Sequence, residues 1–111
     1  VAWRCTEQVL KAGVECVVCM DDIICLNVLN ALRKFEVRIP EDILVASFYN
    51  SSVLEEYYPP ISCVNLDIQA LARTASGVLY DLLQGKEAKK RILQGYEVLI
   101  KDSTNRDKMR K

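Results

Sequence analysis

The sequence contains no histidine among its 111 residues. It also has no glycine-rich phosphate loop and no nucleophile motif, so the usual carriers of acid–base, phosphoryl and nucleophilic chemistry are missing. The formal net charge is zero, which gives no overall basic surface for nucleic acid. The apolar runs have the length of strands, and no signal peptide or membrane span is visible. These absences argue against an enzyme, against nucleic-acid binding by this chain and against membrane insertion.

Half of the residues are apolar, so a core of adequate size and an ordered domain are expected. The basic residues gather late, within residues 86–91 and 106–111. A solvated face and a frayed tail explain these two groups better than a nucleic-acid patch does.

The five cysteines are odd in number and lie mostly in apolar runs, as expected for reduced core thiols in a cytoplasmic protein. Cys16 and Cys19 have the spacing of a redox or zinc pair. However, their segment is typical of a strand, on which residues three apart point to opposite faces. They cannot close a disulfide or share a metal in that conformation, and no second pair completes a zinc site. We therefore expect core packing, with no metal and no cofactor.

Periodicity and turn signals predict alternating helices and strands. Helices are expected over residues 3–12, from Asp21 or Asp22 to about residue 35, over 53–57 as a short turn, and over 68–83 between an Asp67 cap and Gly85. Strands are expected over residues 14–19, 43–48, 61–64 and 96–100. The helix after Asp21 has a predicted core stripe of Ile24, Val28, Ala31, Leu32 and Phe35. Its second apolar edge of Ile23, Leu26 and Leu29 fits either a subunit contact or deep burial. The alternation predicts an α/β fold with a mostly parallel sheet.

The apolar run 43–48 ends abruptly in Tyr49-Asn50-Ser51-Ser52, which is typical of a buried parallel strand opening into a loop. In open α/β sheets, ligands bind at these carboxyl ends of the strands. The chain is therefore expected to recognise a small molecule.

A set of motifs in fixed order carries a resemblance to a known family. The motifs are Val17-Val18-Cys19-Met20-Asp21-Asp22, Leu29-Asn30-Ala31-Leu32, Arg38-Ile39-Pro40-Glu41-Asp42, Val45-Ala46-Ser47-Phe48-Tyr49-Asn50, Pro59-Pro60-Ile61-Ser62-Cys63-Val64, Leu82-Leu83-Gln84-Gly85 and Lys101-Asp102-Ser103-Thr104. From about residue 14 to residue 104 the chain resembles the effector-binding core of LacI/GalR-type transcription regulators. The resemblance implies a three-layer αβα fold of the periplasmic-binding-protein type, in which a sugar or purine binds between two lobes.

The resemblance also implies how much of such a regulator is present. Residues 1–104 correspond to the C-terminal portion of the effector-binding core, and residues 105–111 are expected to be a disordered tail. The DNA-binding helix-turn-helix and the first lobe are absent, so we expect a fragment, either engineered or a truncated gene product. Operator DNA would be bound only through the absent domain.

The family's ligand positions fall on Asp21 and Tyr49. Asp21 is expected to accept hydrogen bonds from ligand hydroxyls, although it could merely cap a helix. Tyr49 replaces the usual aspartate: it can stack on a sugar ring but cannot clamp two hydroxyls as a carboxylate does. Asp22 is expected to be the structural cap beside the site, and Asn50 a structural neighbour.

Leu26, Tyr57, Tyr58 and Pro60 match positions at or near the family's dimer interface. Exposed aromatic residues beside Pro59-Pro60 would form a reasonable contact patch, and local packing of the loop on the sheet is the alternative. A homodimer or larger assembly is expected, because a sheet of few strands exposes an edge to pairing.

Two other functions remain open at this point. A lobe of an exported solute-binding protein would share the fold, although free thiols speak against export. A metal-dependent phosphoreceiver or enzyme could use Asp21 and Asp22 to hold magnesium at a strand end.

Overall fold

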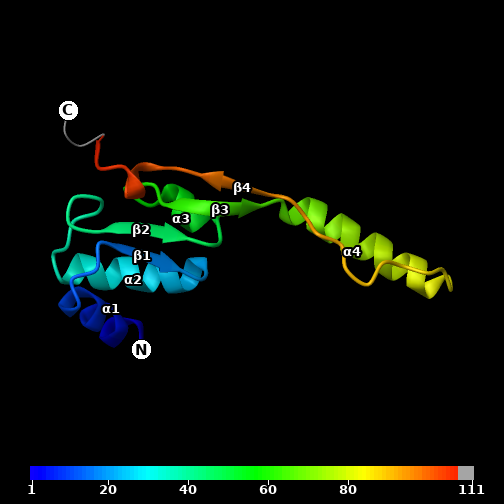
Figure 1. Cartoon of the computed structure of the whole chain (residues 1–111), viewed down its shortest axis with the longest axis horizontal. Helices are drawn as coiled ribbons and strands as arrows, with labels where there is room; N and C mark the ends of the chain where they lie inside the picture. The colour runs from blue at the N-terminus through cyan, green and yellow to red at the C-terminus, as the bar shows by residue number, and fades with distance from the viewer. Residues whose placement is uncertain (108–111) are drawn as a thin grey trace. The chain divides into compact units, whose positions relative to one another are not determined.

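The computed structural model describes residues 1–107 of the chain. Helices and strands alternate as predicted (Figure 1). Their bounds are α1 (Ala2–Lys11), β1 (Cys16–Cys19), α2 (Asp22–Lys34), β2 (Leu44–Ser47), α3 (Ser52–Glu56), β3 (Ser62–Leu66), α4 (Ile68–Leu83), β4 (Tyr96–Leu99) and the 3-10 helix η1 (Asp102–Thr104).

The four strands form one sheet in the order β1-β2-β3-β4. β1 and β2 are parallel, with Cys16 opposite Leu44 and Cys19 opposite Ser47. β3 is parallel to β2, whereas β4 runs in the opposite direction (Figure 1). The predicted α/β fold with a mostly parallel sheet is therefore confirmed.

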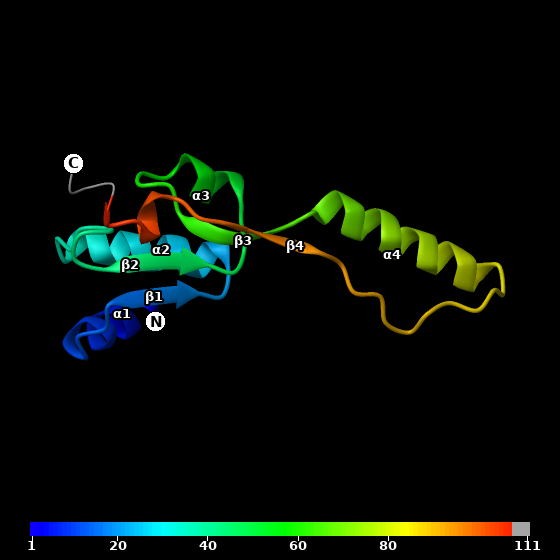
Figure 2. The same cartoon turned by 45° about the horizontal axis from the view of Figure 1, so that its top comes forward.

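The core lies between α2 and one face of the sheet, with α1 packed along α2 (Figure 2). Its buried residues are Cys19, Cys25, Val28, Leu29, Leu32, Ile43, Val45, Leu54 and Ile61. Burial of each large aliphatic side chain contributes roughly 1.5–3 kcal/mol. On the opposite face of the sheet, Val18, Ala46 and Val64 line an apolar groove of about 230 Å³.

The buried stripe of α2 differs from the prediction. Cys25 and Leu29 are buried, whereas Ile24 is 44% exposed and Phe35 is only half-buried. The residues from Ile23 to Leu26 are all apolar or nearly so, and such a run fits several helical stripes equally well. Contact with the sheet decides between them.

α1 turns Thr6 inward and leaves Cys5 exposed, so Cys5 does not belong to its buried side. A ring contact of 4.5 Å between the centroids of Trp3 and Phe35 joins α1 to α2. All five cysteines are free. Cys19 is buried, as core packing requires, whereas Cys16 is exposed, so the expectation of core packing is wrong for Cys16.

A cluster of hydroxyl groups, the hydroxyl clasp, ties the η1 segment to the sheet. The Ser103 side chain is fully buried; its Oγ donates to the carbonyl of Val45 at 2.6 Å and accepts from the Ser62 amide at 2.8 Å. The Ser62 Oγ accepts from the Lys101 amide at 2.7 Å and lies 2.6 Å from the Thr104 Oγ1. The clasp thus joins β2, β3 and the end of the fold.

Beyond η1, the guanidinium Nε of Arg106 donates to the carbonyl of Pro40 at 3.1 Å. Residues 108–111 of the expected tail lie outside the described residues.

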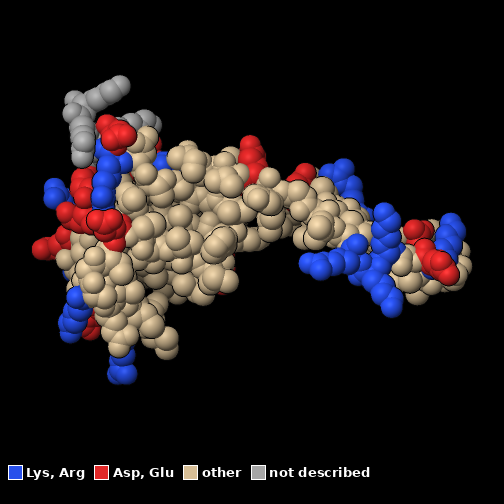
Figure 3. Space-filling view, in the orientation of Figure 1, with Lys and Arg blue, Asp and Glu red and all other residues tan. Residues whose placement is uncertain are grey.

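The chain divides into two compact units, one of Val1–Asn65 with Val98–Lys111 and one of Leu66–Glu97. The second unit holds α4, which begins as predicted at Asp67, whose Oδ1 accepts from the Ala70 amide at 2.9 Å. Gly85 follows its C-terminus with a φ of 76°, as expected for a residue after a helix. No residue of α4 is buried. Basic side chains gather over this unit (Figure 3), including those of the segment 86–91.

Candidate functional site

The carboxyl ends of β1 and β2 lie at the same edge of the sheet because the two strands are parallel. Cys19 pairs with Ser47 in the ladder, and the Phe48 amide donates to the Cys19 carbonyl at 2.9 Å. Asp21 and Tyr49 each lie two residues beyond this pair. We call the segments that follow these two strands, residues 20–24 and 48–52, the strand-end edge.

Asp21 is the N-cap of α2, and its Oδ1 accepts from the Ile24 amide at 2.7 Å. Asp22 is already the first helical residue, and its Oδ1 accepts from the Ile23 amide at 3.0 Å. The expectation that Asp22 is the cap is therefore wrong. Only the residue before the first turn has the extended backbone, here a φ of −147°, that directs a carboxylate at the third amide of a helix. A carboxylate has two oxygens, so the cap uses only part of the acceptor capacity of Asp21.

The backbone of Tyr49 is fixed by the preceding serine. The Ser47 Oγ donates to the Tyr49 carbonyl at 2.8 Å and accepts from the Tyr49 amide at 3.2 Å. Ser47 itself is buried, so this turn has a rigid base at the end of β2. Tyr49 is half-buried in this position.

Asn50 braces the end of β2 against two other elements. Its Nδ2 donates to the Glu55 Oε1 at 2.9 Å and to the Asn65 Oδ1 at 3.2 Å. Glu55 belongs to α3 and Asn65 to β3. Sequence reasoning missed Asn65, because the predicted strand ended one residue before it. The polar side chain directly after the apolar run 61–64 was the available signal.

The strand-end edge also carries exposed apolar side chains that sequence reasoning did not select. Met20 is 70% exposed, Ile23 68% and Phe48 52%. No lysine or arginine occurs within residues 20–24 or 48–52. The edge therefore combines carboxylate, phenol and amide groups with apolar surface, and it lacks a cation that would hold an anionic ligand.

The predicted interface residues are distributed around α2 and the loop after α3. Tyr58 is 85% exposed, whereas Leu26, Tyr57 and Pro60 are half-buried. The Arg33 Nη2 donates to the Tyr57 hydroxyl at 3.2 Å, with its guanidinium carbon 5.5 Å from the ring centroid. Tyr57 and Tyr58 line a cavity of about 410 Å³ together with Leu29, Arg33, Glu36, Val37, Arg38, Ile39 and Pro59. The structure thus brings the two tyrosines together on one surface with the C-terminal half of α2.

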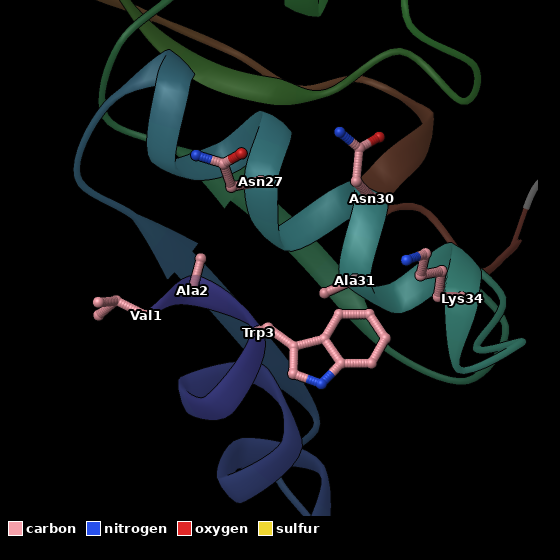
Figure 4. Close-up of a pocket in the computed structure, with 7 residues that line it drawn as sticks. All are labelled: Val1, Ala2, Trp3, Asn27, Asn30, Ala31 and Lys34. Atoms are coloured by element: carbon pink, nitrogen blue, oxygen red, sulfur yellow. The ribbon is translucent and has the colours of Figure 1, made fainter.

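A second cavity, of about 470 Å³, lies between α1 and α2 (Figure 4). The Trp3 indole lies on its α1 side, and Asn27, Asn30 and Lys34 on its α2 side. These three α2 residues are all exposed. None of the residues predicted to contact a ligand lines this cavity.

Within residues 1–107, no group of three or more histidine, cysteine, aspartate or glutamate side chains could hold a metal ion. The magnesium alternative thus has only Asp21 and Asp22, which both bind amides of the first turn of α2. No helix in the described part of the chain has the length and apolar character needed to cross a membrane.

Comparison with known proteins gives a match to the periplasmic binding protein-like domain over residues 2–104. The chain belongs to this family. Among relatives of this periplasmic binding protein-like chain, the HTH-type transcriptional repressor PurR of Vibrio atlanticus (strain LGP32) is 27% identical over 88 residues, covering 79% of this chain and 26% of the relative. The HTH-type transcriptional regulator GalR of Streptococcus thermophilus is 31% identical over 58 residues, covering 52% of this chain and 18% of the relative.

Solved structures show the same fold. The transcription regulator CcpA of Lactococcus lactis superposes with a TM-score of 0.87 at 24% identity, over 94% of this chain and 39% of that one. The lac repressor dimer bound to operator and an anti-inducer gives a TM-score of 0.80 at 23% identity, over 93% of this chain and 32% of the repressor chain. The predicted resemblance to the effector-binding core of LacI/GalR regulators is confirmed. The chain spans about a quarter of the length of the PurR relatives that it matches.

Proposed function

We propose that this chain is the ligand-sensing and dimerisation part of a LacI-type transcription regulator that responds to a small molecule. We propose that this small molecule is a sugar. Operator DNA would be bound by a domain outside this chain, in the cytoplasm. The observation that carries the proposal is the strand-end edge, where Asp21 and Tyr49 follow two register-paired residues of parallel strands. Ligand sites of open α/β sheets lie at this position.

The groups on the edge favour a neutral ligand that donates hydrogen bonds. The Asp21 carboxylate accepts from hydroxyl groups, and the phenol of Tyr49 offers one hydrogen bond and an aromatic face. The absence of lysine and arginine from both segments disfavours a phosphorylated or carboxylated effector. A sugar supplies hydroxyl donors on its edges and an apolar face for stacking, so it matches both kinds of surface.

The test separates the ligand role of Asp21 from its role as a helix cap. Asparagine caps helices about as well as aspartate does, so Asp21→Asn keeps the cap and removes the carboxylate. In calorimetric titrations with neutral mono- and disaccharides and purine bases, we expect one sugar to bind and Asp21→Asn to weaken it about 10–100-fold, the value of a charge-assisted hydrogen bond. Tyr49→Phe should have a smaller effect, because it removes only the hydroxyl.

The control is Asp22→Asn, which alters a neighbouring carboxylate on the same turn and should leave affinity unchanged. If a purine base binds and no sugar does, the effector is a nucleobase and the sugar proposal is wrong. Unchanged affinity in Asp21→Asn would remove this residue from the site.

We further propose that Leu26, Tyr57, Tyr58 and Pro60 form the dimer contact. Tyr58 supports this because a large aromatic side chain that is 85% exposed is typical of an interface anchor. Tyr58→Ser should shift the chain from dimer to monomer in sedimentation velocity. Tyr80→Ser, at a tyrosine of α4 that is 62% exposed, is the matched control and should leave the dimer intact. A wild-type chain that stays monomeric at high concentration would contradict the contact.

A further inference from the structure

The cavity beside Tyr57 and Tyr58 has the features of a socket for an aromatic ring. Its volume of about 410 Å³ lies within the range of pockets that hold small molecules. We call it the tyrosine cavity. Its lining combines aliphatic and charged side chains, among them Leu29, Val37, Ile39, Arg33, Glu36 and Arg38. Such a lining suits a side chain that has an apolar body and a polar tip.

Tyr58 lines the tyrosine cavity and is nevertheless 85% exposed. Its neighbour Tyr57 is half-buried and is held by Arg33, whose Nη2 donates to the Tyr57 hydroxyl at 3.2 Å. One surface therefore carries both a projecting aromatic side chain and a cavity that can receive one. A contact made around a two-fold axis requires this combination, because the same patch of each copy meets itself.

Two charged residues of the cavity have no ionic partner in their own copy. Both Arg33 and Glu36 are exposed. Neither belongs to the ion pairs found within residues 1–107, which are Lys11–Glu7 and Arg38–Asp42. A guanidinium has five donors, so the bond from Arg33 to Tyr57 leaves others available.

The backbone of Glu36 is unusual. Its φ of 58° lies in the left-handed region that favours glycine, directly after Phe35, the C-cap of α2. A glutamate at this position places a carboxylate on the cavity at a cost in backbone free energy. Strained positions of this kind cluster at functional sites, which is consistent with a contact role for Glu36.

We propose that the tyrosine cavity of each copy receives Tyr58 of a second copy of this chain, and that Arg33 of each copy pairs with Glu36 of the other. The pairing rests on the dimer contact proposed above and extends it from Tyr58 to the end of α2. A two-fold axis repeats every contact, so each dimer contains two such rings and two ion pairs. The patch carries charges of both signs, and a second copy complements both, whereas a purely acidic or purely basic partner would leave one sign unpaired.

Charge reversal tests the ion pairs. Two copies with Arg33→Glu bring acid against acid, and two copies with Glu36→Arg bring base against base. Each variant alone should be monomeric in sedimentation velocity where the wild type is dimeric, with its dimer affinity lowered more than about 100-fold. An equimolar mixture of the two variants restores opposite charges at both contacts, so native mass spectrometry should show the heterodimer without either homodimer.

Glu36→Gly separates the charge from the fold. Glycine suits the left-handed backbone, so urea unfolding should show no loss of stability. Two carboxylates are lost from each dimer, so the dimer affinity should fall about 10-fold. Arg4→Glu is the matched control, because it reverses an exposed charge on α1 that does not line the cavity, and it should leave the dimer unchanged.

A photocrosslinking analogue locates the ring. One copy carries p-benzoylphenylalanine in place of Tyr58, and the other copy is isotope-labelled so that links between copies are identified by mass. We expect links to residues 29–39 of the labelled copy. Tyr58→Phe should keep the dimer, because the cavity takes the ring and Tyr58→Phe retains it.

The outcomes separate this pairing from the dimer contact on which it rests. If the wild type is a dimer, the pairing is overturned by links that fall outside residues 29–39, by charge variants that dimerise as the wild type does, or by a mixture that forms no heterodimer. In each of these cases the copies meet through another arrangement. A wild-type chain that stays monomeric at high concentration would instead refute the dimer contact, and the pairing with it.

Discussion

Removal of the Ser103 hydroxyl tests the hydroxyl clasp directly. The Ser103 side chain is fully buried, and its Oγ serves both the Ser62 amide of β3 and the Val45 carbonyl of β2. Ser103→Ala deletes one oxygen and leaves both backbone groups without this partner in the interior.

The expected cost follows from the two hydrogen bonds. Each contributes about 1 kcal/mol, and a buried amide left without a partner adds about 1–3 kcal/mol. We expect Ser103→Ala to lower the free energy of unfolding by about 3–5 kcal/mol. Because a domain of this size loses about 4 °C or more per kcal/mol, the melting temperature should fall by at least roughly 12 °C.

Urea unfolding followed by far-ultraviolet circular dichroism measures this difference. Ser51→Ala is the matched control, because the Ser51 Oγ is also buried but has no hydrogen-bond partner in the described structure. Its removal should not destabilise the chain, because it leaves no other group without a partner. If Ser103→Ala destabilises no more than Ser51→Ala does, the clasp does not hold the fold together.

Other predictions concern a cap, an ion pair and two glycines. Asp21→Ala should cost about 1 kcal/mol in urea unfolding through loss of the α2 cap, and a cost of zero would contradict the observed capping bond. Arg38 lowers the pKa of Asp42 through hydrogen bonds at 3.2 Å, so this pair stabilises the fold above the ordinary aspartate pKa and is lost as the pH falls through the lowered one. Asp42→Asn should therefore be less stable than the wild type at neutral pH and equal to it in strong acid; equal urea midpoints at both pH values would refute the pairing. Gly77 lies within α4 with open space around it, so Gly77→Ala should stabilise α4 by about 0.5–1 kcal/mol. Gly85 has a φ of 76°, so Gly85→Ala should destabilise the end of α4 by about 1 kcal/mol. Shifts of the same sign in circular dichroism melts would contradict this assignment.

Local signals predicted the parts of the fold that depend on nearby residues. The α4 helix was correct at both ends because Asp67 supplies a cap and Gly85 accepts a left-handed backbone. The parallel strands followed from apolar runs separated by a helix, which place the ends of β1 and β2 at one edge. That edge is the site proposed from the sequence, and its ligand contacts remain predictions.

Features decided by one residue or by distant residues could not be predicted in the same way. Asp21 and Asp22 are chemically identical, and only the extended backbone at Asp21 makes it the cap. Which residues of α2 are buried depends on where the sheet packs against the helix. Asn65 enters the site only through its bond with Asn50, fifteen residues earlier in the chain, and Ser103 acquires its role from Val45, fifty-eight residues away. No local pattern records such pairings.

The hydroxyl clasp returns the chain to β2 and β3 after the excursion through residues 66–97. Residues 66–97 are therefore an insertion, and the chain on both sides of it belongs to the other compact unit. A protease that cut the exposed segment 86–91 would yield two polypeptides still held together by the serine and threonine hydroxyls and the strands around them. The nicked protein should elute intact from a sizing column and separate only when denatured, so cleavage there would be silent until the body itself unfolds.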